Sequence, residues 1–140
     1  MGTRKDGSRL LVVDDEFEVI QSVSRALRQV PQRSISSAAA AGDALQVLGT
    51  TSIDAVLVDW KLPDTSGDEL LRRIRENYPD MPAGLVSGHL EAESAAELMR
   101  EGLAGGFLPK PFSNGELLRT VEGLVGAEVV ASPESTVEDD

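Results

Sequence analysis

The chain contains no cysteine and few aromatic residues, and both absences narrow the classes to which it can belong. Without cysteine it forms neither a disulfide scaffold nor a thiolate metal site, and its composition fits a reducing compartment. With 4% aromatic and 41% hydrophobic residues, its core must consist mainly of Leu, Val, Ile and Ala. A length of 140 residues suits one domain around a single hydrophobic core.

Long apolar runs and positive charge are also scarce. No run approaches the length that crosses a bilayer, and the first residues lack the apolar centre of a signal peptide. We therefore expect a cytoplasmic protein that does not associate with a membrane. The net charge is -11, and so acidic a chain gains nothing from counterion release on a nucleic acid. We expect no direct binding to DNA or RNA.

Short apolar runs alternate along the chain with segments of helical periodicity. The runs predict strands at 9–13, 33–39, 54–58, 83–87 and 105–108. The periodic segments predict helices at 16–29, 42–48, 67–78, 91–101 and 113–125. The last of these opens with a capping box, Ser113 and Glu116. Five strand–helix repeats predict an α/β fold, a doubly wound parallel sheet with helices on both faces.

Two tails are expected to flank the folded unit, which we place at residues 9–126. The N-terminal tail is 1–8, and the C-terminal tail is 127–140. The second tail carries five acidic side chains and no Lys or Arg, together with Ser132 and Pro133. This composition predicts an acidic, disordered segment.

Polar residues stand where the predicted strands end. Asp14 and Asp15 follow the first strand, Asp59 follows the third, Ser87 closes the fourth and Lys110 follows the fifth. Taken singly, each has a structural explanation as a helix cap, a turn residue or a surface charge. In open parallel sheets, however, the carboxyl ends of the strands meet at one edge, where functional sites lie. The joint pattern favours a functional cluster.

The chemistry of such a cluster is specific. Carboxylates brought together repel one another, and a divalent cation relieves the repulsion. Oxygen ligands alone favour Mg²⁺, which binds one or two carboxylates together with phosphate oxygens. An aspartate can then act as the nucleophile and become an aspartyl phosphate, while a lysine and a hydroxyl hold the other phosphoryl oxygens.

Four stretches carry a resemblance to a known family. They are LVVDDE at 11–16, VLVDWKLPDTSG at 56–67, LVSG at 85–88 and FLPKPF at 107–112. Over about residues 8–126, the chain resembles the response-regulator receiver domain of two-component signalling, in the CheY-like superfamily. The resemblance implies a flavodoxin-like (βα)5 fold whose five parallel strands have the order 2-1-3-4-5.

The resemblance also implies a metal and an acceptor. It makes Asp59 the phosphorylated residue. It implies that Asp14, Asp15, Asp59 and the main-chain carbonyl of Lys61 bind Mg²⁺, for which Mn²⁺ could substitute. Lys61 and His89 occupy positions that flank the attacking water in this family and tune the lifetime of the phosphoryl group.

The remaining implied roles concern switching. Ser87 and Lys110 bind the phosphoryl group, and the Lys110–Pro111 peptide bond is expected to be cis. Phe107 occupies the position of the switch aromatic, where it lacks the hydroxyl of the usual tyrosine, so a switch would rest on packing alone. Gly105–Gly106 and Pro109 also depart from the common pattern of the family.

As a receiver, the chain would accept phosphate from a sensor histidine kinase or a phosphotransfer protein. It would catalyse only its own phosphoryl transfer and dephosphorylation. Its output would be a protein target or a second copy of the chain, bound through the fourth helix, fifth strand and fifth helix. It could stand alone or come from a larger regulator or a hybrid kinase.

Two alternatives remain open at this point. The chain could be a binding module of receiver fold that does not switch by phosphorylation. It could also be an enzyme on a related sheet. The acidic residues after the first strand disfavour a flavin carrier, since they would repel phosphate, and the adjacent Asp14 and Asp15 do not match the usual aspartyl-phosphatase spacing.

Overall fold

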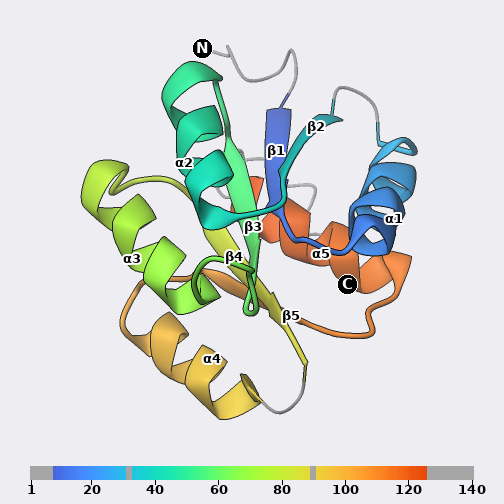
Figure 1. Ribbon diagram of the computed structural model, residues 1–140. Helices are drawn as coiled ribbons and strands as arrows, with labels where there is room; N and C mark the ends of the chain where they lie inside the picture. The colour runs from blue at the N-terminus through green and yellow to red at the C-terminus, as the bar shows by residue number, and fades with distance from the viewer. Residues whose placement is uncertain (1–7, 31–32, 89–90, 126–140) are drawn as a thin grey trace, which may run out of the picture.

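The computed structural model describes residues 8–30, 33–88 and 91–125, and the statements below concern these residues. The two predicted tails, apart from Ser8, lie outside them, as does His89. Strands and helices alternate along the chain (Figure 1). The strands are β1 (Ser8–Val13), β2 (Arg33–Ala38), β3 (Ala55–Asp59), β4 (Ala83–Ser87) and β5 (Gly106–Pro109). The helices are α1 (Phe17–Leu27), α2 (Ala41–Thr50), α3 (Gly67–Asn77), α4 (Ala92–Arg100) and α5 (Asn114–Val125).

The strands form one parallel sheet with the order β2-β1-β3-β4-β5, which confirms the predicted fold class. Helices α1 and α5 cover one face of the sheet, and α2, α3 and α4 cover the other (Figure 1). The order reverses between β1 and β3, and in sheets of this kind the reversal marks where ligands bind.

The two faces of the central strands supply two hydrophobic clusters. Successive side chains of a strand point to opposite faces, so Leu11 and Val56 pack against α2–α4 while Leu10 and Leu57 pack against α1 and α5. The fully buried large side chains are aliphatic, as the low aromatic content requires. Burial on both faces explains why these strands are continuous apolar runs.

Two side chains in the helical apolar pattern are not buried. Phe17 is 68% exposed and Met99 is 39% exposed, whereas Val23 of α1 and Leu98 of α4 lie in the core. Phe17 is the first residue of α1 and lies three residues from the buried Asp14 at the sheet edge, whereas Val19 and Ile20 of the same turn pack against the core. Helical spacing alone did not separate these positions from the core.

Side-chain hydrogen bonds at α5 and α3 also hold the neighbouring backbone in place. Ser113 Oγ accepts a hydrogen bond from Glu116 N–H (3.1 Å), and Glu116 Oε1 accepts one from Ser113 N–H (2.9 Å), which confirms the capping box. At the amino end of the sheet, Arg75 donates to the carbonyl oxygens of Pro79 (3.0 Å), Met81 (2.8 Å) and Leu103 (3.1 Å). Among the described helices, none is long and apolar enough to cross a membrane.

Candidate functional site

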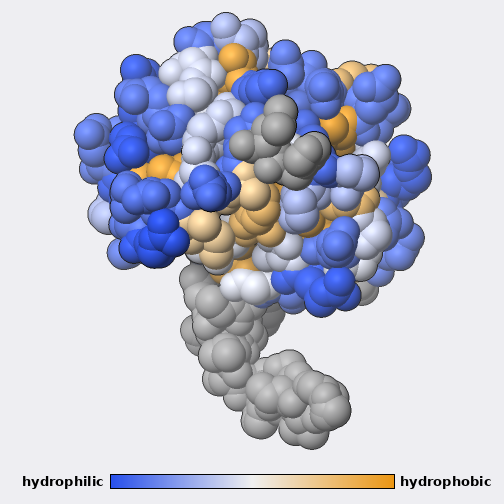
Figure 2. Space-filling model, turned by 90° about the horizontal axis from the view of Figure 1, so that it is seen from below, coloured by the Kyte–Doolittle hydropathy of each residue, from blue (hydrophilic) through white to orange (hydrophobic). Residues whose placement is uncertain are grey.

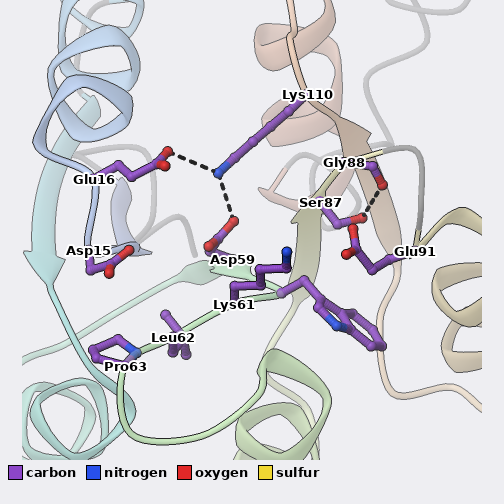
Figure 3. A pocket seen from close by; sticks show the side chains of 11 residues that line it. Asp15, Glu16, Asp59, Lys61, Leu62, Pro63, Ser87, Gly88, Glu91 and Lys110 are labelled. Carbon is purple, nitrogen blue, oxygen red and sulfur yellow. Dashed lines mark hydrogen bonds and ion pairs between the residues drawn. The ribbon is translucent and has the colours of Figure 1, made fainter.

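A pocket of about 470 Å³ opens at the carboxyl edge of the sheet (Figure 3). The predicted residues Asp15, Asp59, Lys61, Ser87 and Lys110 line it, so side chains from four strand ends meet there. These strand ends lie at one edge because of the parallel register, in which Val13 pairs with Val58 and Val58 pairs with Leu85. The residues that follow these positions therefore reach the same edge.

Three carboxylates lie together in this region. Asp14 is 1% exposed and Asp59 is 6% exposed, whereas Asp15 is exposed. One oxygen from each of the three lies within 4.8 Å of the others. Asp14 Oδ1 also accepts a hydrogen bond from Glu16 N–H (2.9 Å), which holds the carboxylate at the turn into α1.

Lys110 supplies the cation that contacts the buried carboxylates. Its Nζ lies 2.9 Å from Asp59 Oδ1 and 3.5 Å from Asp14 Oδ2. Figure 3 shows the lysine reaching between Glu16 and Asp59, and Glu16 Oε1 lies 3.4 Å away. One ammonium therefore faces several carboxylates, and the pocket keeps an excess of negative charge.

Burial and charge shift the pKa values of these groups. Burial raises the pKa of Asp14 to about 6, and the nearby charge of Asp59 adds to this effect while the Glu16 N–H and Lys110 oppose it. Burial also raises the pKa of Asp59, against the opposing hydrogen bonds from Lys110 and from the Lys61 backbone N–H. Burial alone would lower the pKa of Lys110, but its hydrogen bond to Asp59 and the carboxylate charges raise it.

The donor set fits a hard divalent cation. All the converging ligands are carboxylate oxygens, and burial, with a smaller contribution from the charge of Asp59, raises the pKa of Asp14 above its usual range. A cation bound among Asp14, Asp15 and Asp59 would remove the repulsion between them. Oxygen ligands in this number suit Mg²⁺, which retains several waters.

The loop between β3 and α3 forms one wall of the pocket. The backbone N–H of Lys61 hydrogen-bonds to the Asp59 carboxylate, and the Gly67 N–H donates to the carbonyl of Trp60 (2.7 Å). A Cβ atom at Gly67 would overlap the backbone oxygen of Asp59, so only glycine allows the chain to return this closely.

The predicted switch residues occupy two different surroundings. Ser87 is 2% exposed, lines the pocket and donates its hydroxyl to the carbonyl of Gly88 (3.3 Å). Phe107 does not line the pocket but packs, partly buried, against the α2–α4 cluster. The Lys110–Pro111 peptide bond is cis, the isomer that the resemblance implies.

The sequence analysis did not assign several residues of this region. Glu16, Glu91 and Trp60 also line the pocket, and Trp60 packs against the α2–α4 cluster as well. The position of Glu16, directly after the acidic pair, was an available signal. Asp64, three residues beyond Lys61, had no predicted role, but it accepts hydrogen bonds from the start of α2.

The fold has many solved counterparts. A response regulator receiver domain protein from Clostridium thermocellum is 27% identical, with a TM-score of 0.79 over 89% of this chain and 98% of that one. The receiver domain of NtrX from Brucella abortus is 30% identical, with a TM-score of 0.77 over 83% of this chain and 97% of that one.

Curated relatives match the same region. The DNA-binding transcriptional regulator NtrC of Proteus hauseri is 32% identical over 116 residues, which are 81% of this chain and 24% of that protein. The sensor kinase CckA of Brucella abortus is 35% identical over 118 residues, which are 83% of this chain and 12% of that protein. The chain thus spans a quarter or less of the length of these relatives.

The family model agrees with the geometry. The model of the response regulator receiver domain matches residues 10–122. Receiver domains are signalling domains that bind Mg²⁺ in an acidic pocket and pair with histidine kinases and downstream effectors. The chain, with its carboxylates and lysine gathered at the carboxyl edge of a 2-1-3-4-5 sheet, belongs to the response regulator receiver domain family.

Proposed function

We propose that the chain accepts a phosphoryl group onto Asp59 from the phosphohistidine of a sensor histidine kinase or a phosphotransfer protein. The observation that carries this proposal is the contact between Asp59 Oδ1 and Lys110 Nζ, 2.9 Å apart, beside the carboxylates of Asp14 and Asp15. A purely structural role would not require so many carboxylates in one buried place.

The transfer is a single displacement at phosphorus. A carboxylate oxygen of Asp59 forms the new O–P bond as the N–P bond of the phosphohistidine breaks, and the electron pair stays on the imidazole nitrogen. Lys110 Nζ already donates to the Asp59 carboxylate, and it would donate to a phosphoryl oxygen. The Ser87 hydroxyl, now bonded to Gly88, would turn to another phosphoryl oxygen.

The carboxylates of Asp14, Asp15 and Asp59, with the main-chain carbonyl of Lys61, would hold Mg²⁺ or Mn²⁺. When bound, the cation neutralises charge on the phosphoryl oxygens. Hydrolysis of the aspartyl phosphate then resets the domain. The exposed Lys61 side chain and His89, which lies outside the described residues, would tune its rate.

The signal would leave through α4, β5 and α5. Movement of Ser87 toward the phosphoryl group would allow Phe107 to repack, because Phe107 lies on the neighbouring strand in register with Leu85. The altered face would bind a downstream protein or a second copy of the chain. We assign this activity to residues 9–126 and place the protein in the cytoplasm, in agreement with its lack of cysteine.

Incubation with acetyl phosphate and Mg²⁺, followed by intact-mass measurement, tests the acceptor. The wild type should gain the mass of one phosphoryl group, and Asp59→Asn should gain none. Asp80→Asn, which changes an exposed carboxylate beside β4's amino end, is the matched control and should label like the wild type. A wild type that stays unlabelled would favour a binding module that does not switch.

A further inference from the structure

Helix α2 begins without a capping side chain of its own. Its N-cap residue, Ala40, has the extended backbone typical of this position but no side-chain hydrogen bond. The carboxylate of Asp64 takes that place from the β3–α3 loop. Its Oδ1 accepts from the Ala41 N–H (2.9 Å) and its Oδ2 from the Gly42 N–H (3.0 Å). A residue 23 positions away thus satisfies the first free amides of the helix.

The loop that carries Asp64 is also bound to the pocket. Lys61 and Ser66 pair as an antiparallel bridge, and the Leu62 N–H donates to the carbonyl of Thr65 (3.2 Å). Asp64 lies between these paired arms. The same short loop begins with the Lys61 N–H on the Asp59 carboxylate. It is therefore fixed at its base to the acceptor and near its tip to α2.

We propose that Asp64 is a positioning residue for the acceptor pocket, which it serves by holding the loop of residues 61–66 against the start of α2. The proposal rests on the function proposed above and deepens it. Lys61, Leu62 and Pro63 line the pocket. They belong to the same loop as Asp64, so their positions depend on where the tip of this loop is fixed. Because coupling between two sites is reciprocal, a cation that orders the pocket wall also tightens the contact at α2.

A simpler role is helix capping alone. In that case the loss of Asp64 would loosen the first turn of α2 and lower the melting temperature, without changing how the pocket binds a cation. The two roles separate in a chain where α2 receives a local cap. Ala40→Asp places a carboxylate at the N-cap position, where the extended backbone suits capping, but leaves the loop tip unattached.

Mg²⁺ affinity, read from tryptophan fluorescence, tests the proposal. Trp60 is the only tryptophan in the chain and lines the pocket, so a change in its emission as Mg²⁺ is added follows binding there. We expect Asp64→Ala to weaken Mg²⁺ binding about tenfold, as removal of an outer partner of a metal site does. Asp64→Asn should weaken it less, because its amide oxygen can still accept one of the two hydrogen bonds.

Asp43→Ala is the matched control. Asp43 is an exposed carboxylate in the first turn of the same helix, and the described residues give it no hydrogen bond or ion pair with the loop. The substitution removes the same charge near the same helix end but should leave Mg²⁺ affinity unchanged. In Asp64→Ala/Ala40→Asp, thermal stability should recover while the affinity stays low.

Two results would overturn the proposal: Asp64→Ala binding Mg²⁺ as tightly as Asp43→Ala, or Ala40→Asp restoring the affinity together with the stability. Failure of the function itself looks different, since the wild type would then neither bind Mg²⁺ nor accept a phosphoryl group. Acetyl phosphate labelling of the same variants provides a second readout, in which Asp64→Ala should label more slowly than Asp43→Ala.

Discussion

Two aspartate-bearing regions lie near each other at the carboxyl edge of the sheet, and they hold negative charge in opposite ways. In the pocket, burial raises the pKa values of Asp14 and Asp59. At the start of α2, the backbone N–H groups of Ala41 and Gly42 lower the pKa of Asp64. The charged form is therefore disfavoured in the pocket and favoured at the helix. The first arrangement suits ligand binding, and the second suits fixing a loop.

The two regions serve different purposes, one ligand binding and the other stability. The buried carboxylates at the pocket lower the stability of the metal-free fold, and a bound cation would relieve their repulsion. The neighbouring carboxylate at α2 is held by two hydrogen bonds, one to each oxygen. Substitutions of Asp14 and Asp64 should therefore change stability in opposite directions and with opposite dependence on pH.

The largest effect on stability is expected at Lys110. Lys110→Met removes the only cation in contact with Asp14 and Asp59 among the described residues, and keeps much of the side-chain volume. Uncompensated buried carboxylates should lower the free energy of unfolding by about 2 kcal/mol at pH 8 without metal. Urea unfolding measures this difference.

The loss should shrink at pH 5, where Asp14 takes up a proton. Lys61→Met serves as the control, since it removes an exposed lysine of the same pocket wall. Equal stability of Lys110→Met and the wild type at pH 8 would contradict the picture of a pocket held together by this ammonium.

A smaller change of opposite sign is expected at Asp14. Asp14→Asn removes the carboxylate whose pKa rises from 3.8 to about 6. A shift of this size corresponds to at most about 3 kcal/mol at neutral pH. Solvent screening and the lost attraction to Lys110 reduce it, so the metal-free variant should be about 1–2 kcal/mol more stable than the wild type at pH 7.

The pH dependence follows from the same shift. Between the unfolded pKa of 3.8 and the folded value of about 6, the folded state holds the proton more tightly than the unfolded state. The stabilisation from this proton is complete below about pH 4 and is lost as the pH rises through about 6. Asp14→Asn should flatten this part of the wild-type curve. A metal-free wild type that gains stability between pH 4 and pH 6, with no flattening in the variant, would show the sign to be wrong.

The smallest effect is expected at Asp64, with the reverse pH dependence. Asp64→Asn should lower the melting temperature at neutral pH, because it loses one of two hydrogen bonds and the charge at the helix N-terminus. The stabilisation is present above the unfolded pKa of 3.8 and is lost as the pH falls through the lowered folded value. Thermal unfolding of both proteins should therefore give melting temperatures that converge below about pH 4. A constant difference in melting temperature across the whole pH range would show that the ionised form of Asp64 is not the source of the stabilisation.

The fold and the pocket could be predicted from the same feature of the sequence. Apolar strands in a parallel sheet are continuous runs, and the polar residue that ends each run marks the carboxyl edge. Asp14, Asp59 and Lys110 could therefore be placed together before any coordinates were known, and the structure brings them into contact.

The contact at α2 could not be predicted in this way. The helix begins in a run of alanines with no capping residue, and its partner lies 23 positions further along the chain. Capping signals are read within a few residues, so a cap donated by a distant loop leaves no local trace. The exposure of Phe17 could not be predicted either, because helical spacing shows which side of α1 the residue occupies but not whether that side is covered at the helix end.

The space-filling view from below shows apolar residues gathered at the centre of the face, with hydrophilic residues around them (Figure 2).

The amino end of the sheet is held by Arg75, which joins the turn before β4 and the loop before β5 through three carbonyl oxygens. One side chain thus anchors the starts of both strands whose far ends carry Ser87 and Lys110. Because this anchor lies at the amino end, any relative movement of β4 and β5 is expected to be smallest there and largest at their carboxyl ends.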